Sequence, residues 1–271
     1  MMRVAHRSER GSREANEDAV NFYANEILGC FVLADGTGGH EGGALASNAV
    51  VKQVLAHFSA APRIDADSPE MLLTIAREAL FDVRKLNPQF PEMNTTVVTL
   101  VLDTENRLAY WNHLGDSRIY LFRDGRAHCL TTDHSILQTM INAGLCTGTL
   151  RGNCERNMLY AAVGSDDVPE KAICNEPFAL QSGDIFLLCS DGFWENVDEM
   201  RMEETLQQAK TPEQWVDEMM NGVSALCIPD LDNFSALTVW IGEREAETAC
   251  NLVEDPQQAE ETQQAEETRQ E

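Results

Sequence analysis

The sequence has few basic residues and no long apolar segment. Lys and Arg number 20 against 45 Asp and Glu in 271 residues, so the formal net charge is −25. Binding along a phosphate backbone needs clustered Lys and Arg, so this balance excludes a basic nucleic-acid-binding protein, and it disfavours attachment to anionic membranes. No stretch approaches the roughly 20 apolar residues that cross a bilayer. We therefore expect neither a nucleic-acid partner nor a membrane partner, whereas metal cations are compatible with the charge.

Two further absences concern the cysteines and the first residues. Eight cysteines are present, but no two form a Cys-x-x-Cys pair, so zinc and thioredoxin-like sites have no local support. The first residues contain no apolar core of signal-peptide length. We therefore expect a cytoplasmic protein with reduced thiols, of which Cys30 and Cys189 lie in apolar runs typical of a core.

The composition that remains is globular, with 43% hydrophobic and 24% charged residues. Its character changes at residue 243. Residues 243–271 are rich in Glu and Gln, and they contain the hexapeptide Gln-Gln-Ala-Glu-Glu-Thr twice in succession. Because almost nothing in this segment can be buried, we expect one folded domain over residues 1–242 and a disordered acidic tail over 243–271.

Apolar spacing in residues 1–242 predicts groups of strands and pairs of helices. Helical spacing occurs over 42–58, 69–86, 199–208 and 212–226. Strand-like runs cover 27–34, 95–102, 108–113, 118–123, 126–130, 184–189 and 235–241. The dipeptide Asp124-Gly125 predicts a two-residue hairpin. No helix separates the strands between 95 and 130, so the pattern favours antiparallel sheets flanked by helices over a doubly wound parallel sheet.

Acidic residues lie beside several of these strands. Asp35-Gly36 and Asp191-Gly192 end apolar runs, and Glu17-Asp18 and Asp232-Asn233 lie in neighbouring loops. Each pair alone is an ordinary turn. Carboxylates that converge at the ends of buried strands, however, repel one another unless cations neutralise them, and all-oxygen ligands select Mg²⁺ or Mn²⁺. A site for a hard divalent metal is therefore predicted where these strand ends meet.

Seven short motifs occur in a fixed order along the folded domain. They are Arg-Glu-Ala-Asn-Glu-Asp at 13–18, Ala-Asp-Gly-Thr-Gly-Gly at 34–39, Asn-Thr-Thr at 94–96, Leu-Gly-Asp-Ser-Arg at 114–118, Leu-Thr-Thr-Asp-His-Ser at 130–135, Ser-Asp-Gly-Phe-Trp at 190–194 and Asp-Asn-Phe-Ser at 232–235. As an ordered set they resemble the metal-dependent Ser/Thr protein phosphatases of the 2C family in their compact bacterial form. The resemblance implies an α+β fold, a four-layer α/β/β/α sandwich of two antiparallel sheets flanked by helices, with a metal centre at one edge.

The same resemblance implies a two-metal centre for Mn²⁺ or Mg²⁺. Asp35 would bridge both ions, and Gly36 would offer its carbonyl oxygen to the second. Asp191 and Asp232 would complete the coordination of the first ion.

Further roles follow from the motif positions. Glu17 and Asp18 would act mainly through metal-bound waters, and Asn233 would orient Asp232. Asp116 would hold, together with Asp191, a third and weaker ion. Arg13 matches the phosphate-binding arginine of the family, and the planar fork of a guanidinium suits bidentate contact with phosphate.

The implied reaction is direct attack on phosphorus by a hydroxide that bridges the two metals, and the sequence has no Cys-x5-Arg loop that would form a phosphoenzyme. Thr37 stands where animal members carry a histidine that protonates the leaving group. Thr37 cannot act as a general acid near pH 7, so either His40 or a metal-bound water would have to do so. His40 also suits the start of a helix. Residues 157–164 lack a Thr-Arg pair frequent in bacterial members, and 136–156, the flap region of those members, suits a loop.

The leading hypothesis is a monomeric Ser/Thr protein phosphatase whose partner is a phosphorylated protein, either a bacterial Ser/Thr kinase or a kinase target. Similar phosphatases include members linked to type VI secretion. One alternative is a pseudophosphatase, a binding module of the same fold, against which the intact Asp35, Asp191 and Asp232 argue. Another is an unrelated metal-dependent hydrolase such as a nuclease, against which the negative charge argues.

Overall fold

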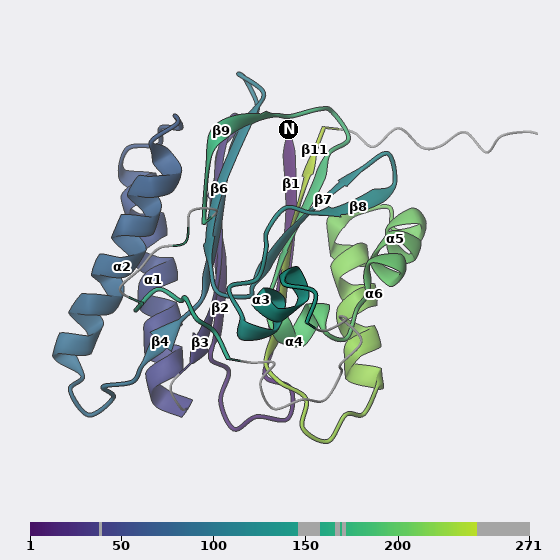
Figure 1. Cartoon of the computed structure of the whole chain (residues 1–271). Coiled ribbons are helices and arrows are strands. Elements are labelled where there is room, and N and C mark those ends of the chain that lie inside the picture. Colours follow the sequence, from purple (N-terminus) through teal and green to yellow (C-terminus); the bar gives the residue numbers. More distant parts are fainter. Residues whose placement is uncertain (38–39, 146–157, 166–168, 170–171, 243–271) are drawn as a thin grey trace, which may run out of the picture.

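The strands form two antiparallel sheets that face each other (Figure 1). The computed structural model describes residues 1–37, 40–145, 158–165, 169 and 172–242. One sheet has the strand order β1-β11-β10-β7-β8. Its strands are β1 (Met2–Glu9), β11 (Phe234–Ile241), β10 (Ile185–Cys189), β7 (Arg118–Arg123) and β8 (Arg126–Cys129). The other sheet has the order β2-β3-β5-β6-β9, with a short β4 paired to β3. Its strands are β2 (Asp18–Ala24), β3 (Leu28–Thr37), β4 (Asn94–Thr95), β5 (Val97–Asp103), β6 (Leu108–Leu114) and β9 (Ile173–Ala179).

Helices cover the outer face of each sheet (Figure 1). The helices α1 (His40–Ala60) and α2 (Ser68–Leu86) pack against the sheet that contains β3, whereas α5 (Glu199–Gln208) and α6 (Pro212–Ala225) pack against the sheet that contains β11. Two shorter helices are α3 (Ile136–Asn142) and α4 (Asp191–Trp194). The predicted four-layer α/β/β/α sandwich is therefore confirmed.

The core has three layers, because each sheet is apolar on both faces. Phe31, Leu100 and Phe186 are fully buried between the sheets. Separate clusters fill the two spaces between sheet and helix, and Trp215 on α6 anchors one of them. Strands covered on both faces read as continuous apolar runs, which explains why every residue of β5 and β11 is buried.

The predicted hairpin is confirmed at Asp124-Gly125. Both residues adopt positive φ, at 53° and 71°, the geometry that lets a two-residue turn follow the twist of its strands. Cys30 and Cys189 are buried, as predicted. Among the described residues, no helix is long and apolar enough to cross a membrane.

One region differs from its prediction. Residues 136–156 were expected to form a loop, but their first part forms α3, because the side chain of Ser135 accepts a hydrogen bond from the backbone N–H of Gln138 and caps the helix. The remainder of that region, 146–157, and the predicted acidic tail, 243–271, lie outside the described residues.

Candidate active site

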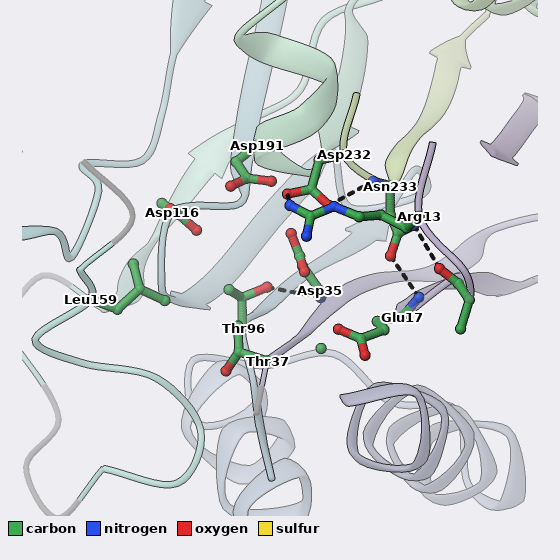
Figure 2. Close-up of a pocket in the computed structure, with 12 residues that line it drawn as sticks. Arg13, Glu17, Asp35, Thr37, Thr96, Asp116, Leu159, Asp191, Asp232 and Asn233 are labelled. Atoms are coloured by element: carbon green, nitrogen blue, oxygen red, sulfur yellow. Dashed lines mark hydrogen bonds and ion pairs between the residues drawn. The ribbon is translucent and has the colours of Figure 1, made fainter. Parts of the chain in front are cut away.

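The strand register brings the acidic segments to one edge of the sandwich. Asp18 pairs with Asp35 across β2 and β3. Asp191 follows β10, Asp232 precedes β11, and Asp116 precedes β7 at the same edge. Here the chain encloses a cavity of about 210 Å³ (Figure 2). Its lining is Arg13, Ala15, Glu17, Asp35, Gly36, Thr37, Thr96, Asp116, Leu159, Asp191, Asp232 and Asn233.

Asp35 is held by Thr95, the last residue of β4, and by Thr96, which separates β4 from β5. Its backbone N–H donates to Thr96 Oγ1 at 2.9 Å, and its carbonyl oxygen accepts from Thr95 Oγ1 at 2.9 Å. Burial raises the pKa of the Asp35 carboxyl well above its usual range, and the neighbouring carboxylates, Asp18 first and then Asp191, raise it further. A cation among these carboxylates would offset that repulsion.

Gly36 allows the first turns of α1 to approach β3 closely. A Cβ atom at Gly36 would lie only 2.2 Å from the carbonyl oxygen of Gly43, so no larger residue fits there. The Gly36 N–H donates to the carbonyl oxygen of Glu17 at 3.1 Å, and Ser47 Oγ on α1 donates to the same oxygen at 2.5 Å. The backbone beside Asp35 therefore also fixes Glu17.

Arg13 reaches the acidic cluster from the loop between β1 and β2. Its Nη2 donates to Asp232 Oδ2 at 2.7 Å, and the two side chains are 52% and 35% exposed. Asp191 starts α4, where its Oδ1 accepts from the N–H of Gly192 at 2.6 Å. Burial raises the pKa of Asp191, and the charge of Asp232 adds to the shift. A guanidinium and several carboxylates thus share one cavity.

Asn233 organises the loop that carries Arg13. Its Oδ1 accepts from the Glu17 N–H at 2.8 Å, and its Nδ2 donates to the carbonyl oxygens of Arg10 and Ala15 at 2.7 and 2.9 Å. The backbone N–H of Asn233, rather than its side chain, donates to Asp232 Oδ1 at 2.8 Å. The Asn233 side chain therefore positions the Arg13 loop, a role that the sequence did not indicate.

Asp18 alone among the predicted site residues does not line the cavity. It is 6% exposed, and its Oδ2 accepts from Ser190 Oγ at 2.8 Å and Ser235 Oγ at 2.6 Å. Its buried Oδ1 has no hydrogen-bond partner among the residues that the structure describes. Burial raises its pKa to about 7 against the effect of these two hydroxyls. Both serines fall within the motifs at 190–194 and 232–235, but only the tertiary structure shows that they meet Asp18.

The donor set fits a hard divalent cation. The oxygens are carboxylates whose mutual repulsion a cation would relieve, and the orphaned Oδ1 of Asp18 lies behind them. Within the described residues, no group of three or more His, Cys, Asp or Glu side chains is placed so that it could hold a metal ion by itself. Water and backbone carbonyls such as that of Gly36 would supply the other ligands. Thr37 lines the cavity, and α1 begins at His40, as expected for a helix-entry residue.

A family comparison supports this interpretation. The model of the family described as Protein phosphatase 2C matches residues 6–225, which include the cavity residues from Arg13 to Asp191. The chain belongs to the protein phosphatase 2C family. Within this family fold, Thr96 and Leu159 are cavity residues to which the sequence assigned no role, although Thr96 lies in one of the seven motifs.

Individual relatives of this 2C-family chain are bacterial. It is 34% identical over 217 residues to the serine/threonine protein phosphatase PstP of Mycobacterium tuberculosis. The match covers 76% of this chain and 39% of the relative, so the chain spans about two fifths of that protein. The catalytic domain of PstP in complex with two manganese ions has a TM-score of 0.75 at 26% identity, covering 89% of this chain and 99% of that one. PppA of Pseudomonas aeruginosa is described as a key regulatory component of T6SS. Its structure has a TM-score of 0.69 at 25% identity, and the match covers 89% of this chain and 97% of that one.

The raised pKa values predict how the metal-free protein responds to pH. The folded state holds protons on Asp18 and Asp35 that the unfolded chain releases near pH 4, so stability falls as pH rises from about 4 through about 7. In EDTA the melting temperature should therefore be lower at pH 8 than at pH 5.5, and Asp18→Asn should reduce this difference. Saturating Mn²⁺ should raise the melting temperature most at pH 8. A melting temperature in EDTA that rises over this interval would contradict the assignment.

Proposed function

We propose that this chain is a metal-dependent serine/threonine protein phosphatase that hydrolyses phosphoserine and phosphothreonine. The observation that carries the proposal is the meeting of Asp35, Asp116, Asp191 and Asp232, from four separate segments, with the guanidinium of Arg13 in one cavity. Phosphoryl transfer to water requires divalent cations, which carboxylates can hold, and a further positive group such as an arginine. Names of relatives that include serine/threonine phosphatases support the same reaction.

The residues divide into those that hold cations and those that bind phosphate. When bound, two Mn²⁺ or Mg²⁺ ions would lower the pKa of a water molecule and neutralise phosphate charge. Asp35 and the Gly36 carbonyl would hold one ion, and Asp35 with Asp191 and Asp232 the other. Arg13 would donate to phosphate oxygens. Its Nη2 already lies 2.7 Å from Asp232 Oδ2, so an arriving phosphate would compete with that carboxylate for the same N–H group.

The substrate proposed is a phosphorylated protein from a bacterial kinase pathway. The bacterial relatives support this setting, and the likeness to PppA makes a role in type VI secretion one form of it. The partner would be a Ser/Thr kinase or one of its targets. The acidic tail, residues 243–271, is proposed to be dispensable for catalysis, because the lining residues that belong to the described part of the chain come from positions 13–233.

A direct assay tests the proposed activity. Purified protein given a phosphothreonine peptide should release phosphate with Mn²⁺, release none with EDTA, and recover when Mn²⁺ is restored. Asp191→Asn should reduce the rate strongly, because it removes a carboxylate from the cation site. The same peptide carrying phosphotyrosine serves as the specificity control. Absence of Mn²⁺-dependent release from phosphothreonine would rule out the proposed function.

A further inference from the structure

Trp194 connects two acidic segments of the cavity that are far apart in the sequence. It lies three residues after Asp191, on the single turn of α4. Its indole Nε1 donates to the backbone carbonyl oxygen of Asp116 at 2.9 Å. The hydrogen bond therefore ties the turn before β7, which carries Asp116, to the helix that carries Asp191.

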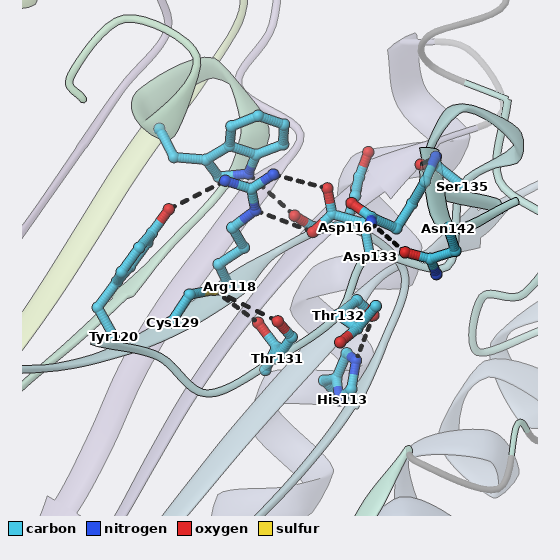
Figure 3. A network of polar contacts seen from close by, with 12 residues as sticks. His113, Asp116, Arg118, Tyr120, Cys129, Thr131, Thr132, Asp133, Ser135 and Asn142 are labelled. Carbon is cyan, nitrogen blue, oxygen red and sulfur yellow. Dashed lines mark hydrogen bonds and ion pairs between the residues drawn. The ribbon is translucent and has the colours of Figure 1, made fainter. Parts of the chain in front are cut away.

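Arg118 stacks on the Trp194 ring, and its polar contacts are drawn in Figure 3. Its guanidinium carbon lies 3.4 Å from the centroid of the Trp194 ring. Its Nε and Nη2 donate to the two carboxylate oxygens of Asp133, both at 2.8 Å, and its Nη1 donates to the hydroxyl of Tyr120 at 3.0 Å. The Arg118 side chain is 19% exposed and that of Asp133 is 8% exposed, so these contacts are largely shielded from water. Arg118 therefore combines a cation–π contact with a bidentate ion pair.

The chain that follows Asp133 continues to a third side of the cavity. The carbonyl oxygen of His134 accepts from the Tyr160 N–H at 2.9 Å, and Ser135 forms a β-bridge with Leu159. Leu159 lines the cavity. The Arg118–Asp133 ion pair therefore braces the Leu159 side of the cavity as well as the Asp116 and Asp191 side.

Asp116 needs such bracing because its surroundings oppose its charge. It is 7% exposed and faces the carboxylate of Asp191, so the two would separate if their backbones were free to move. Its backbone is held at its own carbonyl by Trp194 and, two residues later, by the stacking of Arg118 on the same ring.

We propose that Arg118 and Trp194 are positioning residues that hold Asp116 opposite Asp191, so that a divalent cation can bind between them. The inference rests on the proposed metal-dependent function. Neither side chain belongs to the cavity lining, and both act through the backbone of the residues that do. Replacing a residue that orients a metal ligand typically lowers metal affinity about tenfold to a hundredfold.

The protein contains a matched control at the other end of the same strand. Arg123 ends β7 and forms a bidentate ion pair with Asp184, with N–O distances of 2.8 and 2.7 Å, and its guanidinium lies 5.0 Å from the Phe178 ring centroid. Its exposure of 23% is close to the 19% of Arg118. Arg123→Lys therefore removes the same chemical arrangement at a distance from the cavity.

The experiment compares Arg118→Lys, Trp194→Phe and Arg123→Lys with the wild-type chain. Lysine keeps the charge but not the fork, and phenylalanine keeps a ring under Arg118 but lacks the indole N–H. For each protein we would measure the melting temperature in EDTA, Mn²⁺ binding by isothermal titration calorimetry, and phosphate release as a function of Mn²⁺ concentration. The first two variants should need about tenfold more Mn²⁺ for half-maximal activity, and calorimetry should show a weakened binding step. Their rate at saturating Mn²⁺ should approach that of the wild type.

Arg123→Lys should lower the melting temperature and leave both metal curves unchanged. The inference is overturned if Arg118→Lys and Trp194→Phe behave like Arg123→Lys, losing stability with no change in Mn²⁺ binding. Because calorimetry needs no turnover, it decides this point even if the wild-type protein proves inactive on phosphopeptides. Inactivity would overturn the proposed function, whereas unchanged calorimetric binding would overturn the positioning role.

Discussion

Asp35→Asn should abolish Mn²⁺-dependent phosphate release. The side chain lies among the carboxylates of Asp18, Asp116 and Asp191, which makes it the residue best placed to be shared between two cations. Losing a shared ligand forfeits several kcal/mol of transition-state stabilisation. Because each 1.4 kcal/mol changes the rate about tenfold, we expect kcat to fall by roughly three powers of ten or more. Phosphate release from a phosphothreonine peptide at saturating Mn²⁺ measures it.

The same substitution should not damage the fold. Asparagine avoids the cost of burying an ionisable carboxyl beside other carboxylates, so the melting temperature of Asp35→Asn in EDTA should equal or exceed that of the wild type. The increase caused by Mn²⁺ should disappear. Asp103 provides the control, because it is 6% exposed, ends β5 away from the cavity, and accepts a hydrogen bond from the Asn106 N–H at 2.8 Å. Asp103→Asn should keep the activity. Activity of Asp35→Asn within tenfold of the wild type would disprove the bridging role.

Arg13→Ala should lower kcat/KM without weakening metal binding. Hydrogen bonds to a charged partner contribute about 1.5–3 kcal/mol, so the expected loss is roughly ten- to a hundredfold. Removing the guanidinium also frees Asp232 Oδ2, which it contacts at 2.7 Å, so Mn²⁺ affinity should be unchanged or slightly higher. Steady-state kinetics on a phosphothreonine peptide and calorimetric Mn²⁺ titration separate the two effects.

Arg10 serves as the comparison for Arg13. It lies in the same loop, and among the described residues its guanidinium donates only to the backbone carbonyl of Glu14, from Nη1 at 3.3 Å. Arg10→Ala should therefore change kcat/KM little. An equal loss in both variants would point to a general effect of positive charge near the cavity, and a loss of Mn²⁺ affinity in Arg13→Ala would argue against phosphate binding as the role of this residue.

The sequence predicted the interior of the fold better than its edges. Strands buried on both faces were found from their apolar runs, but β1, β2 and β9 were missed, and all three are edge strands. Their residues are largely part-exposed, as in β1, where Ala5 alone is buried. In addition, β9 contains Pro177, which a strand tolerates at an edge. An edge strand keeps less of the apolar pattern, so period and run length alone reveal it poorly. The fourth edge strand, β8, was predicted as the run that follows the Asp124-Gly125 turn.

For the site, the order of the motifs placed the carboxylates, but it did not reveal how they are held. The sequence contains Ser190, Trp194 and Ser235, yet their roles depend on contacts across 172, 78 and 217 positions of the chain. Local spacing carries no information about such pairs. The contact between Asn233 and the Arg13 loop could not be predicted for the same reason, since the Asn233 amide reaches back across more than two hundred residues.

The far end of the sandwich has a practical consequence. Gly242 donates its N–H to the carbonyl oxygen of Met1 at 3.0 Å, and β1 and β11 then run side by side to Glu9 and Phe234 near the cavity. Eight strand residues at about 3.3 Å each separate the two ends by roughly 25 Å. Tethering the protein to a sensor surface through Met1 or Gly242 would therefore leave the edge that carries the cavity facing the solution.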